Sequence, residues 1–150
     1  GVSNTSNRAF CGLDGDANVP TDVENSAKVT GLVGMGWDSA DANIQIMHND
    51  LSGAATKIDL GSGFPVPTTD RSEVYELQLF SPNSLTQSVS YRVIRYDKTD
   101  NTIAAEATGT ITTNLPPVGT LLAPALRMSV GGVSSVVGVS CMGILIGREY

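Results

Sequence analysis

The chain contains few residues whose type and spacing could support catalysis. His48 is the only histidine, so any Ser–His–Asp arrangement would have to use it. The sequence has no Gly-x-Ser-x-Gly segment, the tight turn that exposes a nucleophilic serine in many hydrolases. In an expected strand, His48 also shares its parity with the apolar residues Ile44 and Ile46. We therefore interpret His48 as a structural histidine and expect no catalytic residues and no enzyme activity.

Acidic residues offer two further kinds of chemistry. Asp38, Asp41 and Asp50 could supply the paired carboxylates that hydrolyse glycosides, but acids clustered around a turn are more often capping or solvent-facing groups. Residues 14–18 have the acidic start of a calcium-binding loop, but they are not followed by the glycine at the sixth position or the closing glutamate of an EF-hand. We interpret this segment as a turn, and we predict no metal site and no cofactor.

Residues 35–50 form the strongest candidate for a binding site. They contain the only tryptophan, Trp37, among short acids and amides. A glycan site needs a flat ring that stacks on a sugar face, beside side chains that hydrogen-bond to hydroxyl groups. The candidate glycan-binding residues are Trp37, Asp38, Asp41, Asn43, Gln45 and Asn49. The alternative is that Trp37 packs in the core or at a contact between subunits.

Charge and hydropathy exclude two classes of partner. The net charge is −6, and the nine lysines and arginines are scattered, so we expect no nucleic-acid surface. A membrane helix needs roughly 18–20 consecutive apolar residues. The most apolar segment, residues 133–146, is interrupted by Gly138, Ser140 and Gly143. We therefore expect a buried strand there and no membrane insertion.

Period-two alternation predicts strands along the whole chain. It is clearest at residues 73–80, where Tyr75, Leu77 and Leu79 share one face. The expected strands are residues 8–13, 30–37, 43–48, 54–60, 73–80, 88–96, 102–113, 121–130 and 133–146. Eight to ten strands without helical crossovers predict an all-β, antiparallel β-sandwich of jelly-roll type.

The length of 150 residues fits a single domain. We expect residues 1–14 to form a lead-in with the first strand, and residues 15–150 to form the rest of the sandwich. The sequence begins at Gly1 without a methionine or a signal peptide, so we interpret it as a piece of a longer chain.

The two cysteines, Cys11 and Cys141, lie near opposite ends of the chain in apolar, strand-like segments. Neither has a histidine or a second cysteine at metal-ligand spacing. We interpret both as buried free thiols. A single bridge joining the terminal strands is the alternative, and the sequence does not decide between them.

A series of short motifs carries a family resemblance. They are Gly36-Trp37-Asp38, Asp41-Ala42-Asn43, the run from Gln45 to Asp50, Gly53, the run from Thr56 to Gly61, Phe64-Pro65, Tyr75-Glu76-Leu77, Leu79-Phe80, Tyr91-Arg92-Val93, Thr113-Asn114-Leu115-Pro116, Leu121-Leu122 and the terminal Glu149-Tyr150. In order and spacing they resemble the C-terminal domain of bacteriophage tail fibre and tailspike proteins. The resemblance covers most of the chain from Val33 onward.

The resemblance implies a virion component on the distal, extracellular part of a tail fibre or tailspike. Such a domain is a homotrimer that either recognises a host cell-surface polysaccharide or caps and locks the fibre. Its expected partners are further copies of itself, the host polysaccharide and an upstream fibre or β-helix segment. The resemblance supplies no catalytic residue, because depolymerase activity in tailspikes typically lies in the preceding β-helix.

The C-terminal segment gives an independent reason to expect self-association. In residues 133–146 apolar side chains fall on both faces of the expected strand. A strand that is apolar on both faces must meet a second layer or a neighbouring chain. The candidate trimer-interface residues are Val136, Met142, Ile144 and Ile146.

Overall fold

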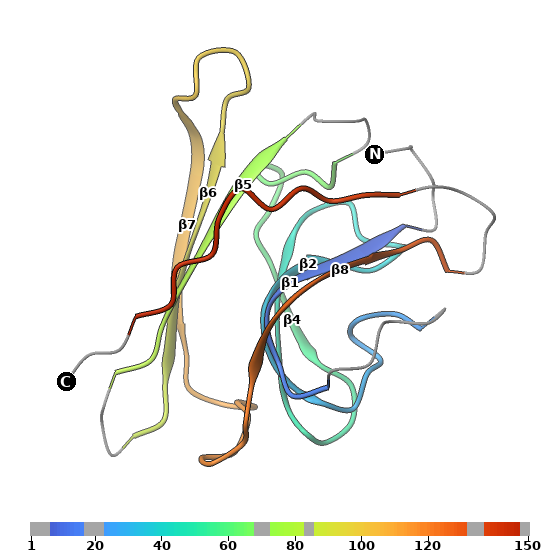
Figure 1. The fold of residues 1–150 in the computed structure, drawn as a ribbon, viewed down its shortest axis with the longest axis vertical. Helices are drawn as coiled ribbons and strands as arrows, with labels where there is room; N and C mark the ends of the chain where they lie inside the picture. The colour runs from blue at the N-terminus through green and yellow to red at the C-terminus, as the bar shows by residue number, and fades with distance from the viewer. Residues whose placement is uncertain (1–6, 17–22, 68–72, 83–85, 132–136, 148–150) are drawn as a thin grey trace.

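Eight β-strands and no helix make up the described part of the chain. A computed structural model describes residues 7–16, 23–67, 73–82, 86–131 and 137–147. The strands are β1 (Arg8–Asp14), β2 (Gly31–Trp37), β3 (Gln45–Asp50), β4 (Thr56–Asp59), β5 (Val74–Phe80), β6 (Val89–Tyr96), β7 (Ile103–Ile111) and β8 (Ala123–Ser129) (Figure 1). Within these described residues, no helix is long and apolar enough to cross a membrane.

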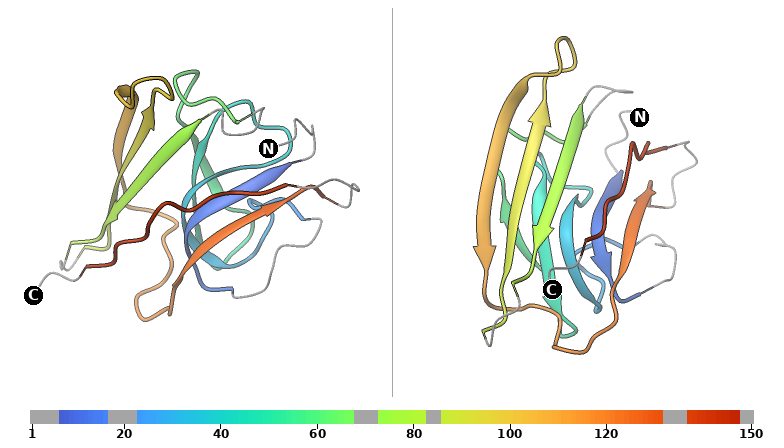
Figure 2. Two further views of the ribbon diagram at one scale, coloured as in Figure 1. Left: turned by 45° about the horizontal axis from the view of Figure 1, so that its top comes forward. Right: turned by 60° about the vertical axis from the view of Figure 1, so that its left-hand side comes forward.

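The strands form two antiparallel sheets that pack face to face. One has the order β4-β3-β2-β1-β8 and the other β5-β6-β7. The smaller sheet lies over part of the larger one (Figure 2). The predicted all-β, antiparallel architecture is therefore confirmed. The jelly-roll type stays a prediction, because the described pairings are those of two meanders closed by one long-range pair, β1 with β8.

The main core lies between the two sheets and follows the predicted alternation. Tyr75, Leu77 and Leu79 of β5 all pack against it, as does Val93 of β6. The buried members of this core are Ala9, Val33, Trp37, Ile44, Ile46, Phe64, Val93, Ile111 and Leu115. Ile44 and Ile46 face this core while Met47 faces the opposite side of the sheet, so the predicted parity of β3 is confirmed.

A second, smaller core lies on the outer face of the five-stranded sheet. Phe10, Leu32, Met47 and Ala55 form it under the segment around residues 23–30. Asn25 holds this segment down by donating from Nδ2 to the carbonyls of Ala9 and Trp37, at 3.0 and 3.1 Å. The Ala55 amide adds a hydrogen bond of 2.7 Å to the Ser26 carbonyl. The outer face is therefore closed by a loop rather than by a third sheet.

Glycines in β1 and β2 make room for the Phe10 ring on that face. A Cβ on Gly34 would lie 2.8 Å from Phe10 Cζ and 2.7 Å from Gly12 Cα. A Cβ on Gly12 would meet Gly34 Cα at 2.5 Å and Phe10 Cζ at 3.1 Å. The two glycines thus lie opposite each other under the ring.

The C-terminal segment differs from its prediction. Residues 137–147, which we call the C-terminal strap, form no strand and join neither sheet. The strap runs past the free edge of β5 on one side and β1 on the other (Figures 1 and 2). The expected doubly buried strand at 133–146 is therefore wrong for residues 137–146, because no second layer covers them in the part of the chain that the structure describes. Both cysteines are free thiols, but neither is fully buried as expected, since Cys11 is half-buried and Cys141 is exposed.

Candidate functional site

Trp37, the centre of the candidate glycan site, belongs to the main core. Only 9% of the residue is exposed, and it packs among the buried residues between the sheets. Its indole Nε1 donates a hydrogen bond of 2.8 Å to Asn7 Oδ1, which is itself buried. The ring therefore offers no free face to a sugar in this chain. Of the two interpretations of Trp37, core packing is the one that its position supports.

Asp38 and Asp41 share a cation on the turn after β2. Lys57 Nζ from β4 lies 3.2 Å from Asp38 Oδ2 and 2.6 Å from Asp41 Oδ1. The Asp38 carboxylate also accepts the Ser26 amide at 3.3 Å. Burial acts to raise the pKa of Asp38, but these hydrogen bonds and the charge of Lys57 outweigh it and hold the pKa below its usual range. Two carboxylates that share one lysine tie β4 to the turn after β2 and keep a net charge of −1 between them.

The three amides of the candidate site are also engaged within the chain. Asn43 Nδ2 donates to the Asp59 carboxylate at 3.1 Å, and Gln45 Nε2 donates to the Asn43 carbonyl at 3.1 Å. Asn49 is buried and donates to the carbonyls of Lys28 and Gly53. Gln45 and Asn49 have the parity of Met47 on the outer face, whereas Trp37 faces the main core. The six residues therefore do not form one surface.

The remaining sequence candidates have structural partners as well. His48 is buried, and its Nδ1 lies 3.1 Å from the Asn114 carbonyl. Asp50 accepts from the Ser52 amide at 3.0 Å, which closes a turn. Asp14 is buried and binds Thr30 and Arg127, so its carboxylate is already occupied by protein groups. Across the described parts of the chain, no three His, Cys, Asp or Glu residues gather as a metal site would require.

Replacing Lys57 with methionine tests the tie between β4 and the turn after β2. We expect the free energy of unfolding to fall by about 1–2 kcal/mol at pH 7, because Asp38 would stay largely buried without its cation. A lowered pKa in the folded state stabilises the fold above about pH 4, the ordinary range for aspartate, and this stability is lost on acidification. Urea unfolding at pH 7 and pH 3 should therefore show a smaller pH effect in Lys57→Met than in the unmodified protein. Lys98→Met, at an exposed turn, is the matched control and should leave both values unchanged within about 0.5 kcal/mol.

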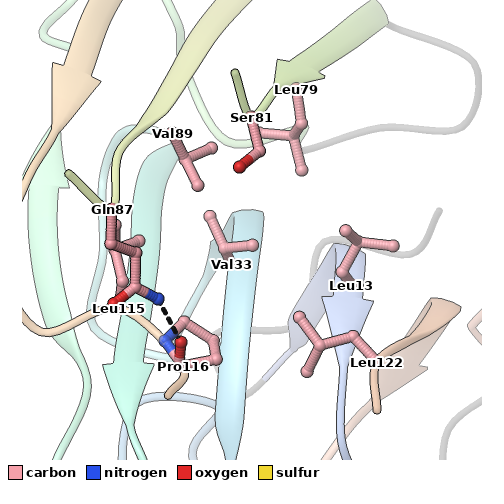
Figure 3. A pocket seen from close by; sticks show the side chains of 9 residues that line it. All are labelled: Leu13, Val33, Leu79, Ser81, Gln87, Val89, Leu115, Pro116 and Leu122. Atoms are coloured by element: carbon pink, nitrogen blue, oxygen red, sulfur yellow. Dashed lines mark hydrogen bonds between the residues drawn. The ribbon is translucent and has the colours of Figure 1, made fainter. Parts of the chain in front are cut away.

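A cavity between the two sheets was not predicted from the sequence. It has a volume of about 180 Å³ and is lined by Leu13, Val33, Leu79, Ser81, Gln87, Val89, Leu115, Pro116 and Leu122. Figure 3 shows the aliphatic side chains of β1, β2 and β5 pointing toward one another around it. At one side the Gln87 amide donates to the Pro116 carbonyl. The lining comes from segments far apart in sequence, so no motif could have indicated it.

The strap is the other feature that the rest of the fold does not explain. Met142 is 89% exposed and Leu145 is 98% exposed, although both are fully apolar. Three further large apolar residues of the strap are also exposed, namely Val139, Ile144 and Ile146. Of the candidate trimer-interface residues, Met142, Ile144 and Ile146 lie on this surface, and Val136 lies outside the described residues. Aliphatic residues repeated at this density are unusual on the surface of a monomer.

The strap and the cavity are the two features that could bind an apolar group. The polar side chains selected from the sequence mainly make hydrogen bonds and ion pairs within the chain. Comparisons with protein-family models, with curated proteins and with solved structures found no match to this chain.

Proposed function

We propose that this domain is a non-catalytic structural module that associates with further copies of itself through the C-terminal strap. The observation that carries the proposal is the exposure of five large apolar side chains in a strap with no charged residue. Burial of such side chains is worth about 1.5–3 kcal/mol each, so leaving all of them in water is costly. A second copy of the chain that covers the strap removes this cost.

The area of the strap is of the size that association needs. Its five exposed residues together present on the order of 600 Å² of accessible surface, most of it apolar. A stable interface buries roughly 800 Å² on each partner. The strap therefore supplies most of one side of a stable interface, and the surface around it needs to add only a modest share.

The identity of the assembly rests on the family resemblance. We propose a homotrimer at the extracellular end of a phage tail fibre or tailspike, in which the domain trimerises and caps the fibre below an upstream segment. Of the two roles that the resemblance implies, capping is favoured over recognition of a host polysaccharide. The reason is that Trp37 is in the core and the amides around it bond within the chain.

Leu145→Asp tests the proposed function. Leu145 is almost fully exposed in one copy, so the aspartate should leave the fold of the single chain intact. In an assembly it would place a charge in a buried apolar contact, and we expect the dissociation constant to rise at least about 100-fold. Light scattering should give three times the 15.6 kDa chain mass for the unmodified protein and the mass of one chain for the variant.

Ile103→Asp is the matched control for this experiment. Ile103 is also an exposed aliphatic residue, but it begins β7, at the opposite edge of the small sheet from β5. This variant should assemble like the unmodified protein. A stable monomer of the unmodified chain at micromolar concentration would overturn the proposal, as would a trimer that both variants retain.

A further inference from the structure

The chain carries both an apolar protrusion and an apolar cavity, and neither is filled by the other within the described residues of one copy. The strap exposes Leu145 almost completely, while the cavity between the sheets is lined by seven residues other than Ser81 and Gln87, all apolar. We propose that an aliphatic side chain from residues 144–146 of a second copy occupies this cavity. The inference rests on the proposed self-association and names the surface that receives the strap.

The size and chemistry of the cavity fit such a side chain. A dry protein cavity of about 150 Å³ holds a benzene molecule, so about 180 Å³ accommodates one leucine or isoleucine side chain. Most of the wall is apolar, with Leu13, Val33, Leu79 and Leu115 among its residues, and the polar residues of the lining are Ser81 and Gln87 (Figure 3). An aliphatic group placed against the apolar part of this wall gains dispersion contacts that the wall otherwise lacks.

The cavity is not enclosed, and its lining includes residues that are exposed to solvent. Ser81 and Gln87, at the connection between β5 and β6, line the cavity and are exposed to solvent. Leu122 lines it from the segment before β8, and its neighbour Leu121 is 91% exposed. Val118 in the same connection is also exposed. The exposed apolar residues Leu121 and Val118 therefore lie in the same connection as Leu122, which lines the cavity.

The occupant is assigned to a second copy because of where the strap lies in the first. None of the described strap residues lines the cavity, and Leu145 makes almost no contact with its own chain. A protrusion and a cavity at different places on one chain form a head-to-tail contact, which closes into a ring when the rotation between copies allows it. In a ring of three copies, each cavity would hold a side chain from the strap of a neighbouring copy.

Ser81→Phe tests the inference from the side of the cavity. Ser81 is exposed and small, so a phenylalanine there can turn its ring into the cavity without displacing a buried residue. We expect the dissociation constant of the assembly, measured by light scattering over a dilution series, to rise at least about tenfold. Ser81→Ala removes only a hydrogen bond of 3.2 Å to the Ser88 carbonyl and should leave assembly unchanged.

Crosslinking identifies the occupant directly and does not depend on the stability of Ser81→Phe. Ser81→Cys and Leu145→Cys are made singly in chains that carry Cys11→Ala and Cys141→Ala, then mixed under a mild oxidant. We expect a disulfide-linked dimer only in the mixture, and covalent rings when both substitutions are in one chain. An internal disulfide in monomers of the double variant would show that the strap fills its own cavity and would overturn the inference.

The outcomes separate the inference from the proposed function. If the unmodified protein is a monomer, the proposed function fails and the inference fails with it. If the protein assembles and Leu145→Asp dissociates it, but Ser81→Phe has no effect and no crosslink forms, only the inference is overturned. The strap would then dock on another part of its partner.

Discussion

Asp14→Ala is expected to lower the free energy of unfolding by about 3–5 kcal/mol, the usual loss when one partner of a buried ion pair is removed. Asp14 pairs with Arg127 across the β1–β8 end of the large sheet, and both side chains are more than nine-tenths buried. Thr30 Oγ1 also donates to Asp14 at 2.9 Å. The substitution would therefore leave a buried guanidinium and a buried hydroxyl without their acceptor. Urea unfolding at pH 7 measures the loss.

Two variants control for this result. Glu106→Ala breaks an exposed pair with Arg92 of the same chemical type, and it should cost far less stability than Asp14→Ala. Asp14→Leu combined with Arg127→Met removes both charges and should recover much of the loss, because an apolar pair of similar volume can replace a buried ion pair. Equal losses for Asp14→Ala and Glu106→Ala would contradict the structure on this face of the sheet.

The burial of Arg127 links this pair to the outer core. Its guanidinium lies 4.5 Å from the centroid of the Phe10 ring, and its Nε donates to Asn25 Oδ1 at 3.3 Å. Asn25 in turn holds the covering loop to β1 and β2. The ion pair, the ring and the loop therefore form one connected unit. Loss of Asp14 should loosen residues 23–30 as well, which hydrogen exchange of their amides can detect.

Gly34→Ala is expected to destabilise the protein by at least about 3 kcal/mol, the upper part of the range for overpacked sites. The added Cβ would lie 2.4 Å from the Cys11 carbonyl oxygen and 2.7 Å from Gly12 Cα, and backbone atoms inside a sheet cannot move away cheaply. The Phe10 ring closes the remaining direction at 2.8 Å. We expect a matching drop in the urea midpoint, or no folded protein at 37 °C.

Gly63→Ala is the matched control for this prediction. A Cβ at Gly63 would meet only the Cβ of Ala105, at 3.5 Å, which is an ordinary contact. The change should therefore shift stability by less than about 1 kcal/mol. A double variant, Gly34→Ala with Phe10→Leu, tests whether the added Cβ clashes mainly with the Phe10 ring or with the backbone. Only a small rescue is expected, because the closest contacts are with backbone atoms.

The alternation of apolar and polar residues determined most of the strands. In β5, Tyr75, Leu77 and Leu79 alternate with polar residues, and the structure packs all three apolar side chains against the main core as expected. This works because a strand has a side-chain period of two whatever its partners are. The sequence by itself also determined that this is an all-β, antiparallel fold, since the short connections leave no room for helical crossovers.

The tertiary structure alone decided the role of Trp37 and of the polar residues near it. Alternation states that a residue lies on one face of a strand, but it does not state whether that face is covered. The main core covers Trp37, and the loop around Asn25 covers the outer face. The candidate glycan-binding residues therefore make contacts within the chain and do not form an exposed binding surface. The cavity likewise depends on how β1, β2 and β5 come together.

The C-terminal strap is a second case in which the sequence pattern did not determine burial. Its apolar residues predicted a strand buried on both faces, and the described residues of one chain supply a layer for neither face. An apolar sequence indicates that burying the segment is favourable. Only the three-dimensional arrangement shows whether the same copy of the chain buries it. Here one copy does not, and that is the physical reason for placing a second copy on the strap.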